Sequence, residues 1–249
     1  MDPRDIGVSV IRAADDANVP ARLLGGVAVA LHCPTASLPA FQRQYEDIDV
    51  VIEKRGRKHI DAIARSCGFE PDIEFNNLHG LERRTYYSER HGKMDVFVGR
   101  FSMCHSLSFE GRLEADHPTV SLADLVLTKA QIYELNLKDA HDLIALLADH
   151  PVASGDDETI NADRIGDVCG KDWGFWRTVT RTFETIEQIV RSEPVLAPQR
   201  ETVVSALAVL RRELERAPKS SKWKMRSKVG DRKSWYALPE DPDRKPAVA

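Results

Sequence analysis

The residues of this sequence best suited to chemistry are three aspartates, Asp47, Asp49 and Asp95, each within a short apolar run. Asp47 and Asp49 lie in the run 47–52, whose β-branched residues predict a strand. Because side chains alternate faces along a strand, these two carboxylates share one face, with Cα atoms roughly 6.6 Å apart. Like charges this close favour a bound cation, and Mg²⁺ prefers carboxylate oxygen.

Asp95 supplies a third carboxylate, inside the apolar run 93–98. The runs 84–87 and 93–98 predict two strands joined by a polar turn, and a neighbouring strand can bring Asp95 onto the face of the other two carboxylates. Three carboxylates suit two magnesium ions, which can hold an attacking and a leaving oxygen on either side of phosphorus. The sequence therefore predicts a metal site for phosphoryl or nucleotidyl transfer.

A phosphate cradle is predicted at Gly25 and Gly26, between an apolar run at 21–24 and a short apolar helix at 27–32. Without Cβ atoms, the backbone N–H groups of the two glycines can approach a triphosphate, and the helix directs its positive end there. Arg43, shortly before the carboxylate strand, has a fork of donors to grip the same phosphates. Each feature alone is more often structural, and their order along the chain favours function.

In this order the residues resemble the DNA polymerase β-type nucleotidyltransferase superfamily. The matching segments are Leu23-Leu24-Gly25-Gly26, Arg43, Asp47-Ile48-Asp49 and Met94-Asp95-Val96. Within that superfamily, the sequence is most similar to the minimal group that includes AbiE-type (abortive infection) toxins and bacterial antibiotic nucleotidyltransferases. A downstream stretch is similar to one in AbiE-type proteins, namely 121–125, Lys129 and 137–143. The resemblance covers about residues 19–147.

The resemblance implies an α/β (α+β) nucleotidyltransferase fold, with a small mixed sheet flanked by helices. It implies transfer of NMP from an NTP to an acceptor, with pyrophosphate released. Asp47 and Asp49 would bind both magnesium ions, and Asp95 would bind the catalytic ion and help to deprotonate the acceptor hydroxyl. Lys129 would contact phosphate.

Asp139 and Asp142 lie about one helical turn apart, so both can face one side, where they would orient Lys129 or the acceptor. Acids near a helix start also commonly stabilise the helix dipole, so the sequence leaves both interpretations open. Three residues depart from the pattern of relatives: Gly26 replaces a serine, Tyr45 a threonine and Asn136 an arginine. None of these departures removes a carboxylate.

Composition limits where the protein works. The chain has 249 residues, 42% hydrophobic content and a net charge of −4, so it can bury a large core and does not attract nucleic acid as a whole. No apolar run approaches the roughly 20 residues needed to span a bilayer, and the acidic N-terminus does not resemble a signal peptide. The cysteines form no metal or disulfide pattern. We expect a cytoplasmic protein that does not enter membranes.

Helical periodicity predicts three further helices at 161–169, 173–190 and 198–214. We therefore expect a nucleotidyltransferase domain at 1–150, a helical domain at 158–217 and a basic, partly disordered tail at 218–249, with residues 151–157 as the linker. Disorder is expected at 241–249.

The acceptor is left open by the sequence. Lysine and arginine at 219–233, interleaved with Trp223 and followed by Trp235 and Tyr236, can grip an RNA backbone and stack bases, although such runs are also ordinary solvated surfaces. An AbiE-like toxin would modify an RNA end such as that of tRNA, and it would have a cognate antitoxin. An antibiotic nucleotidyltransferase would bind an aminoglycoside. The rivals are a catalytically inactive nucleotide-binding or interaction module of the same fold and, more weakly, metal-dependent phosphodiester hydrolysis.

Overall fold

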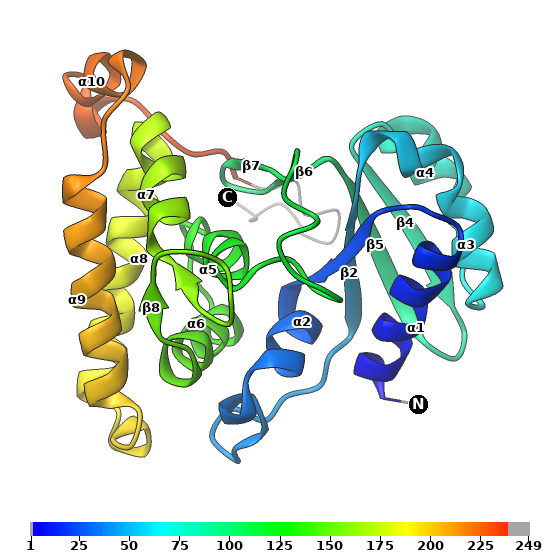
Figure 1. The fold of residues 1–249 in the computed structure, drawn as a ribbon, viewed down its shortest axis with the longest axis horizontal. Helices are drawn as coiled ribbons and strands as arrows, with labels where there is room; N and C mark the ends of the chain where they lie inside the picture. The colour runs from blue at the N-terminus through cyan, green and yellow to red at the C-terminus, as the bar shows by residue number, and fades with distance from the viewer. Residues whose placement is uncertain (1, 239–249) are drawn as a thin grey trace, which may run out of the picture.

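The structure is a computed structural model that describes residues 2–238, and it combines a mixed β-sheet with a group of helices beside it (Figure 1). The sheet has five strands in the order β1-β2-β5-β4-β3. Their bounds are Ala21–Leu24 for β1, Asp47–Ile52 for β2, Glu70–Pro71 for β3, Arg83–Ser88 for β4 and Gly92–Val98 for β5. Strands β2 and β5 are parallel, and the other pairs are antiparallel. The predicted small mixed sheet flanked by helices is confirmed.

Helices α1 (Pro3–Asp16) and α3 (Ile60–Ser66) pack together and cover one face of this sheet. Their apolar residues recur at helical spacing, and in α1 these residues are all buried. Asp2 caps the first turn of α1 by accepting a hydrogen bond from the backbone N–H of Arg4. Sheet residues such as Val50 and Val96 point into this layer and are fully buried. The opposite sheet face is left to carry polar side chains.

Two short helices flank the strands that bear the acidic residues. Helix α2 (Gly25–His32) follows β1 directly, as the sequence predicted. Helix α4 (Ile73–His79) was not predicted, because none of its residues is buried and its apolar residues show no inward-facing stripe. It packs against β4, and its Ile73 and Leu78 side chains are exposed.

The second half of the chain is helical. Helices α7 (Ala162–Lys171), α8 (Trp173–Ser192) and α9 (Arg200–Arg216) confirm the three predicted there. Helices α5 (Leu122–Ala130) and α6 (Leu137–Asp149) contact α2 as well as this group, so they join the sheet to the helices. Among the described residues, no helix is long and apolar enough to cross a membrane. The domain boundaries at 150 and 158 stay a prediction.

Short elements complete the fold. Two small ladders pair β6 (Arg100–Ser102) with β7 (Ser106–Ser108), and β8 (Val152–Ala153) with β9 (Ile160–Asn161). Helix α10 (Ser221–Ser227) follows α9, and the 3-10 helices are η1 (Pro34–Ser37), η2 (Lys54–Lys58), η3 (Pro194–Leu196) and η4 (Gly230–Arg232). The disorder expected at 241–249 lies outside the described residues.

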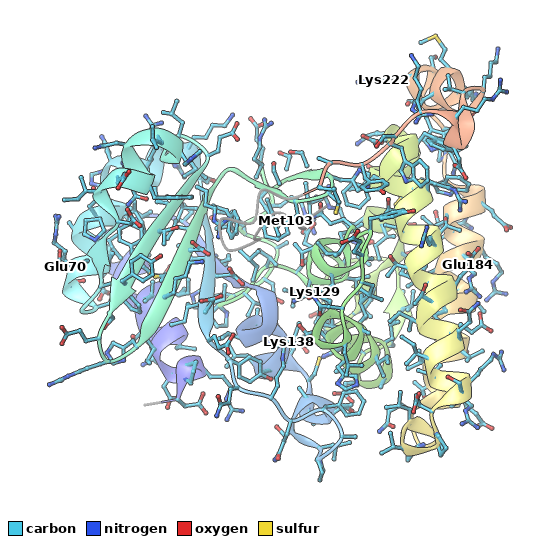
Figure 2. The ribbon with its side chains drawn as sticks, turned by 180° about the vertical axis from the view of Figure 1, so that it is seen from behind. Glu70, Met103, Lys129, Lys138, Glu184 and Lys222 are labelled. Carbon is cyan, nitrogen blue, oxygen red and sulfur yellow. The ribbon has the colours of Figure 1, made fainter. Side chains whose placement is uncertain are left out.

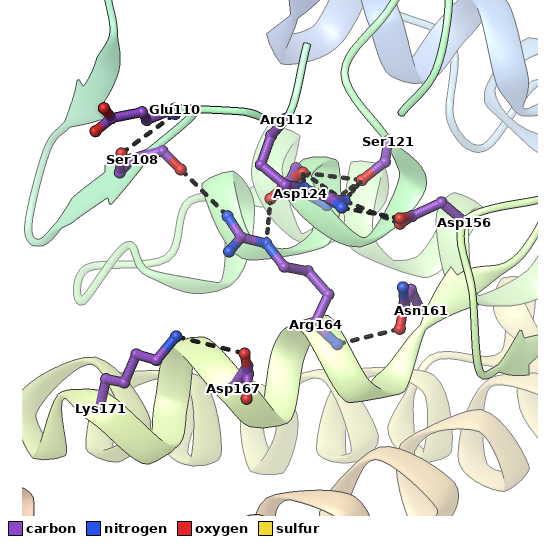
Figure 3. A network of polar contacts seen from close by, with 10 residues as sticks. All are labelled: Ser108, Glu110, Arg112, Ser121, Asp124, Asp156, Asn161, Arg164, Asp167 and Lys171. Atoms are coloured by element: carbon purple, nitrogen blue, oxygen red, sulfur yellow. Dashed lines mark hydrogen bonds and ion pairs between the residues drawn. The ribbon is translucent and has the colours of Figure 1, made fainter. Parts of the chain in front are cut away.

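A buried ion-pair network ties α5 to α7 (Figure 3). Asp124 on α5 is fully buried and accepts hydrogen bonds from Arg112 at 3.1 Å and Arg164 at 2.9 Å. Arg112 also donates to both carboxylate oxygens of Asp156 at 2.9 Å. Ser121 caps α5, because its Oγ accepts a hydrogen bond from the backbone N–H of Asp124. Paired charges therefore hold α5 and α7 together with the two loops that contain Arg112 and Asp156.

Candidate active site

The strand register brings the predicted carboxylates together. On the parallel strands β2 and β5, Asp49 pairs with Asp95, and Asp47 pairs with Lys93. Side chains at paired positions of neighbouring strands point to the same face, so all three aspartates lie on one face of the sheet. In residues 2–238, no group of three His, Cys, Asp or Glu side chains forms a ready-made metal site.

Asp95 is almost completely buried, at 3% exposure, and its carboxylate is fully engaged by neighbouring donors. Arg83 donates to Oδ2 at 2.6 Å, Thr85 donates its hydroxyl to Oδ1 at 2.7 Å, and the Lys93 ammonium lies 3.0 Å from Oδ2. Burial alone would raise the pKa of Asp95, but the hydrogen bonds and charges of these three neighbours hold it below its usual range. Asp95 is therefore a weak proton acceptor in this arrangement.

Sequence reasoning missed Arg83, Thr85 and Lys93. Lys93 lies two positions before Asp95 in the same strand, so alternation places both on one face, whereas only the pairing of β4 with β5 places Thr85 opposite Asp95. The Cζ atom of Arg83 lies 5.7 Å from the ring centroid of Phe75 and 5.4 Å from that of Phe97. Alternation along β4 was a further signal, because it places positions 83 and 85 on one face.

Asp49 and Asp47 differ from Asp95 in having no donor. Within the part of the chain that the structure describes, neither carboxylate makes a hydrogen bond or ion pair. Burial, followed by the nearby charge of Asp95, raises the pKa of Asp49 to about 7. Burial also raises the pKa of Asp47, against the opposing charge of Lys93. Two unpaired carboxylates thus share the sheet face next to Asp95.

The two glycines lie directly against charged side chains. Gly25 has a φ of +72°, and a Cβ at this position would lie 2.1 Å from Asp49 Oδ2. A Cβ on Gly26 would lie 2.2 Å from the Nη2 atom of Arg43. The backbone at the start of α2 can therefore approach the carboxylate and the guanidinium only because both residues are glycine.

Arg43 and Lys129 join the site through a second set of ion pairs. The Nη2 atom of Arg43 donates to both oxygens of Asp142 at 2.7 Å. The Lys129 ammonium lies 2.7 Å from Asp139 Oδ1 and 2.8 Å from Asp142 Oδ2. Burial would lower the pKa of Lys129, but the charges of Asp142 and Asp139 raise it above its usual value. Figure 2 shows Lys129 in the middle of the molecule, between the sheet and the outer helices.

These contacts leave donors free on both basic side chains. An ammonium has three N–H groups, and two of those on Lys129 are directed at Asp139 and Asp142. Arg43 uses only one of its nitrogens on Asp142, so others remain available for an anion. Asp139 and Asp142 lie where they can orient Lys129, although a role for either in binding cofactor stays a prediction.

The donor set fits a hard divalent cation. Asp47 and Asp49 present unpaired carboxylate oxygens on one face, and their pKa values are raised by burial and by mutual repulsion with Asp95. A divalent ion between them would relieve both effects, and carboxylate oxygen is its preferred ligand. The oxygens of Asp95 are less accessible to an ion, because Arg83, Thr85 and Lys93 already bind them.

Comparison with known proteins gives similarity of fold. No protein-family model and no curated protein matches the sequence. An antigenic nucleotidyltransferase-like protein from Paracoccidioides brasiliensis is 16% identical, with a TM-score of 0.42 over 81% of this chain and 93% of its own. The lincosamide antibiotic adenylyltransferase LnuA, bound to lincomycin, is 17% identical, with a TM-score of 0.39 over 53% of this chain and 89% of its own.

A third solved structure, the antibiotic-resistance factor ANT(2'')-Ia, is 12% identical, with a TM-score of 0.38 over 59% of this chain and 84% of its own. At such identities and TM-scores the similarity describes the fold in part and says nothing of the substrate. None of the three is described as an AbiE-type protein.

Proposed function

We propose that this chain is a nucleotidyltransferase that moves NMP from an NTP to an acceptor hydroxyl and releases pyrophosphate. The observation that carries the proposal is the pairing of Asp49 with Asp95 on parallel strands, with Gly25 packed against the carboxylate of Asp49. A fully paired structural cluster would leave no carboxylate without a donor. Here Asp47 and Asp49 have none within the described residues.

The residues around this pair have the properties that binding a triphosphate requires. Gly25 and Gly26 carry no side chain at the start of α2, where backbone N–H groups and the helix dipole favour an anion. Arg43 and Lys129 keep free donors while their aspartate partners hold them in place. The triphosphate would then lie between the glycine turn and the two cations.

Asp47 and Asp49 would hold a divalent cation, Mg²⁺ in the simplest case. When bound, this ion would neutralise charge on the phosphates and stabilise the transition state of in-line transfer. Asp95 stays close to its partners on β4 and keeps the two free carboxylates in register through the strand pairing. The acceptor hydroxyl would approach from the open side of this sheet face.

A basic surface favours an RNA acceptor. Residues 218–238 contain seven lysines and arginines and one acidic residue. Lys222, Lys224 and Lys228 are exposed, and none of the three makes an ion pair within the described chain. Such a surface suits the phosphate backbone of RNA. Figure 2 shows Lys222 at one extremity of the molecule, far from Lys129, so an acceptor that bridges both must be large.

The aromatic residues of this segment pack inside the protein instead. Tyr236 stacks on Tyr133 with ring centroids 3.7 Å apart, and Trp223 meets Trp176 edge-on at 5.3 Å. The Nε1 atom of Trp235 donates to Thr178 at 3.2 Å. We therefore propose contact with the RNA backbone rather than base stacking by these rings. The further proposal of an AbiE-like toxin with a cognate antitoxin rests on the resemblance at 121–143.

The test is a transfer assay with the full chain. The protein is incubated with Mg²⁺, each NTP labelled at the α-phosphorus, and either total tRNA or a panel of aminoglycosides. We expect label on RNA and one pyrophosphate released for each NMP transferred. Label on an aminoglycoside would assign the antibiotic-modifying alternative, and free NMP would indicate hydrolysis.

Two variants decide whether the carboxylates do the chemistry. Asp49→Asn should reduce the transfer rate by about 10²–10³-fold, whereas Asp157→Asn, a matched change at an exposed loop residue, should leave it unchanged. A wild-type protein that binds NTP but releases no pyrophosphate with any acceptor would indicate the inactive nucleotide-binding module.

A further inference from the structure

The carboxylate of Asp95 has almost no room for a metal ion. It accepts from Arg83 and Lys93 at Oδ2 and from Thr85 at Oδ1. A carboxylate offers about four lone-pair positions, so three are taken. An ion shared between Asp95 and Asp49 would have to displace one of these donors.

Charge balance at the site gives the same result. Three carboxylates, those of Asp47, Asp49 and Asp95, face two cations, Arg83 and Lys93, and the net charge of this group is −1. Without nucleotide, one divalent cation brings this group to a net charge of +1, whereas two would bring it to +3 beside Lys93 and Arg83. Such a concentration of positive charge is unfavourable.

The arginine is held where it is by more than its ion pair. Its guanidinium is flanked by the rings of Phe75 and Phe97, so moving it away from Asp95 would break two aromatic contacts as well. Lys93 lies opposite Asp47 on the neighbouring strand, next to the pair formed by Asp49 and Asp95. Arg83 is therefore held beside Asp95 by two ring contacts as well as by its ion pair, and Lys93 is held there by its ion pair and by the register of β5 on β2.

We propose that this site binds a single divalent cation, held by Asp47 and Asp49, and that the side chains of Arg83 and Lys93 take the place of a second ion at Asp95. This inference rests on the proposed nucleotidyltransferase function and replaces the two ions expected from the three carboxylates. Asp95 then binds the Arg83 and Lys93 side chains instead of a metal ion.

Metal stoichiometry tests this directly. Mn²⁺ binding to the wild-type full chain is measured by electron paramagnetic resonance, without nucleotide and with each of the four α,β-nonhydrolysable NTP analogues. Ions carried by free analogue are subtracted by a parallel titration without protein. We expect one bound Mn²⁺ per chain under every condition that gives saturation. Two bound ions per chain would overturn the proposal, without bearing on nucleotidyl transfer.

Variants then test the reason for the single ion. The double variant Arg83→Met, Lys93→Met should bind two Mn²⁺ ions in the presence of an analogue, whereas Lys171→Met, at an exposed lysine on α7, should bind one. If the double variant does not fold, Lys93→Met alone is a milder change that can be measured in its place. We expect this single variant to bind a second Mn²⁺ ion more readily than the wild type does. A folded double variant that still binds one ion would contradict the role given to Arg83 and Lys93.

The inference and the proposed function fail in different ways. If the wild-type chain binds no Mn²⁺ at all, and Asp47→Asn and Asp49→Asn change nothing, then the metal site itself is wrong. If it transfers NMP with two ions bound, the proposed function stands and only the inference is lost.

Discussion

Two buried aspartates in this molecule are held in nearly the same way, yet their surroundings differ. Asp95 in β5 and Asp124 in α5 are 3% and 0% exposed, and each is bound by two cations and one hydroxyl group. The donors are Arg83, Lys93 and Thr85 for the first, and Arg112, Arg164 and Ser121 for the second.

The difference lies in what surrounds each cluster. Around Asp124, the two arginines are matched by Asp124 and Asp156, so the charges are balanced, and the network joins α5 and α7 to the two loops that contain Arg112 and Asp156. Around Asp95, the unpaired carboxylates of Asp47 and Asp49 remain. Buried ion pairs alone therefore do not mark a functional site. Unpaired carboxylates beside such ion pairs do indicate a functional site, because their negative charge requires a bound ligand to balance it.

The largest effect on folding is expected at the balanced cluster. Asp124→Ala removes a fully buried carboxylate from two partly buried arginines and leaves Arg164 without its ion-pair partner, so we expect the free energy of unfolding to fall by about 3–5 kcal/mol. Urea denaturation followed by circular dichroism measures this change. Asp157→Ala, at an exposed residue next to the same network, should change it by less than about 0.5 kcal/mol. A loss below about 1 kcal/mol for Asp124→Ala would show that the comparison is wrong.

At the unbalanced cluster, the effect is expected on activity instead. Asp49→Asn should reduce the rate of NMP transfer by about 10²–10³-fold, as for other groups that stabilise transition-state charge. The pKa of Asp49 is raised to about 7 from 3.8, so its contribution to stability is lost as the pH rises through 7. Asparagine at position 49 does not ionise, so the variant does not lose stability in this way.

The melting temperature of Asp49→Asn at pH 8, measured without metal, should consequently equal or exceed that of the wild type. A lower melting temperature together with unchanged transfer would assign Asp49 a structural role like that of Asp124. Addition of Mg²⁺ should stabilise the wild type more than the variant, because the ion binds the folded carboxylates.

A third buried group, His105, sharpens the comparison, because the charge that acts on its pKa, that of Asp172, belongs to neither cluster. His105 is hydrogen-bonded to Thr178 at 2.8 Å, and burial lowers its pKa to about 4, against the charge of Asp172. The folded pKa lies below the unfolded value of 6.5, so the stabilisation is present above pH 6.5 and is lost as the pH falls to 4.

We expect this loss to be about 2–3 kcal/mol, and it should be absent from His105→Gln. Unfolding free energies of the two proteins, measured between pH 4 and pH 7, isolate the contribution of His105 from that of Asp49, which has the opposite sign. Mn²⁺ binding should be the same in both. An identical pH dependence in the two proteins would exclude His105 as its source.

The sequence predicted local features well. The runs 21–24, 47–52 and 93–98 became β1, β2 and β5, because β-branched and apolar residues bounded by turns indicate strands wherever they pack. Helix α4 was missed, since it buries nothing and so leaves no periodic signal. A helix with no buried residue is difficult to predict from the sequence, because no periodic apolar stripe marks it.

Of the candidate site, the three aspartates could be found from the sequence, whereas their partners could not. Arg83 reaches Asp95 only through the register of β4 on β5, and a shift of one residue would turn it to the other face. Arg164 reaches Asp124 across 40 positions in the sequence. Contacts of this kind depend on the assembled fold, so the number of metal ions could not be inferred from the count of carboxylates alone.

The smallest expected effect on stability is that of a glycine substitution at the start of α2, and it again distinguishes the candidate site from the Asp124 network. Apart from chain neighbours, no described glycine would bring a Cβ against a side chain of the Asp124 network, whereas a Cβ on Gly26 would meet Arg43. In a helix, glycine to alanine usually stabilises by about 0.4–1 kcal/mol, but a Cβ here would collide with the guanidinium that Asp142 holds. We therefore expect Gly26→Ala to destabilise the wild type by about 1 kcal/mol.

In an Arg43→Met background, the obstacle is gone, and the same substitution should stabilise the protein by about 0.5 kcal/mol. The four proteins form a double-mutant cycle, read by urea denaturation, and the change of sign is the diagnostic result. An effect of Gly26→Ala that is equal in both backgrounds would mean that Arg43 does not lie against the start of α2. The glycine turn would then have to be kept free of a side chain for another reason, and the ion pair between Arg43 and Asp142 would no longer connect α6 to the candidate phosphate site.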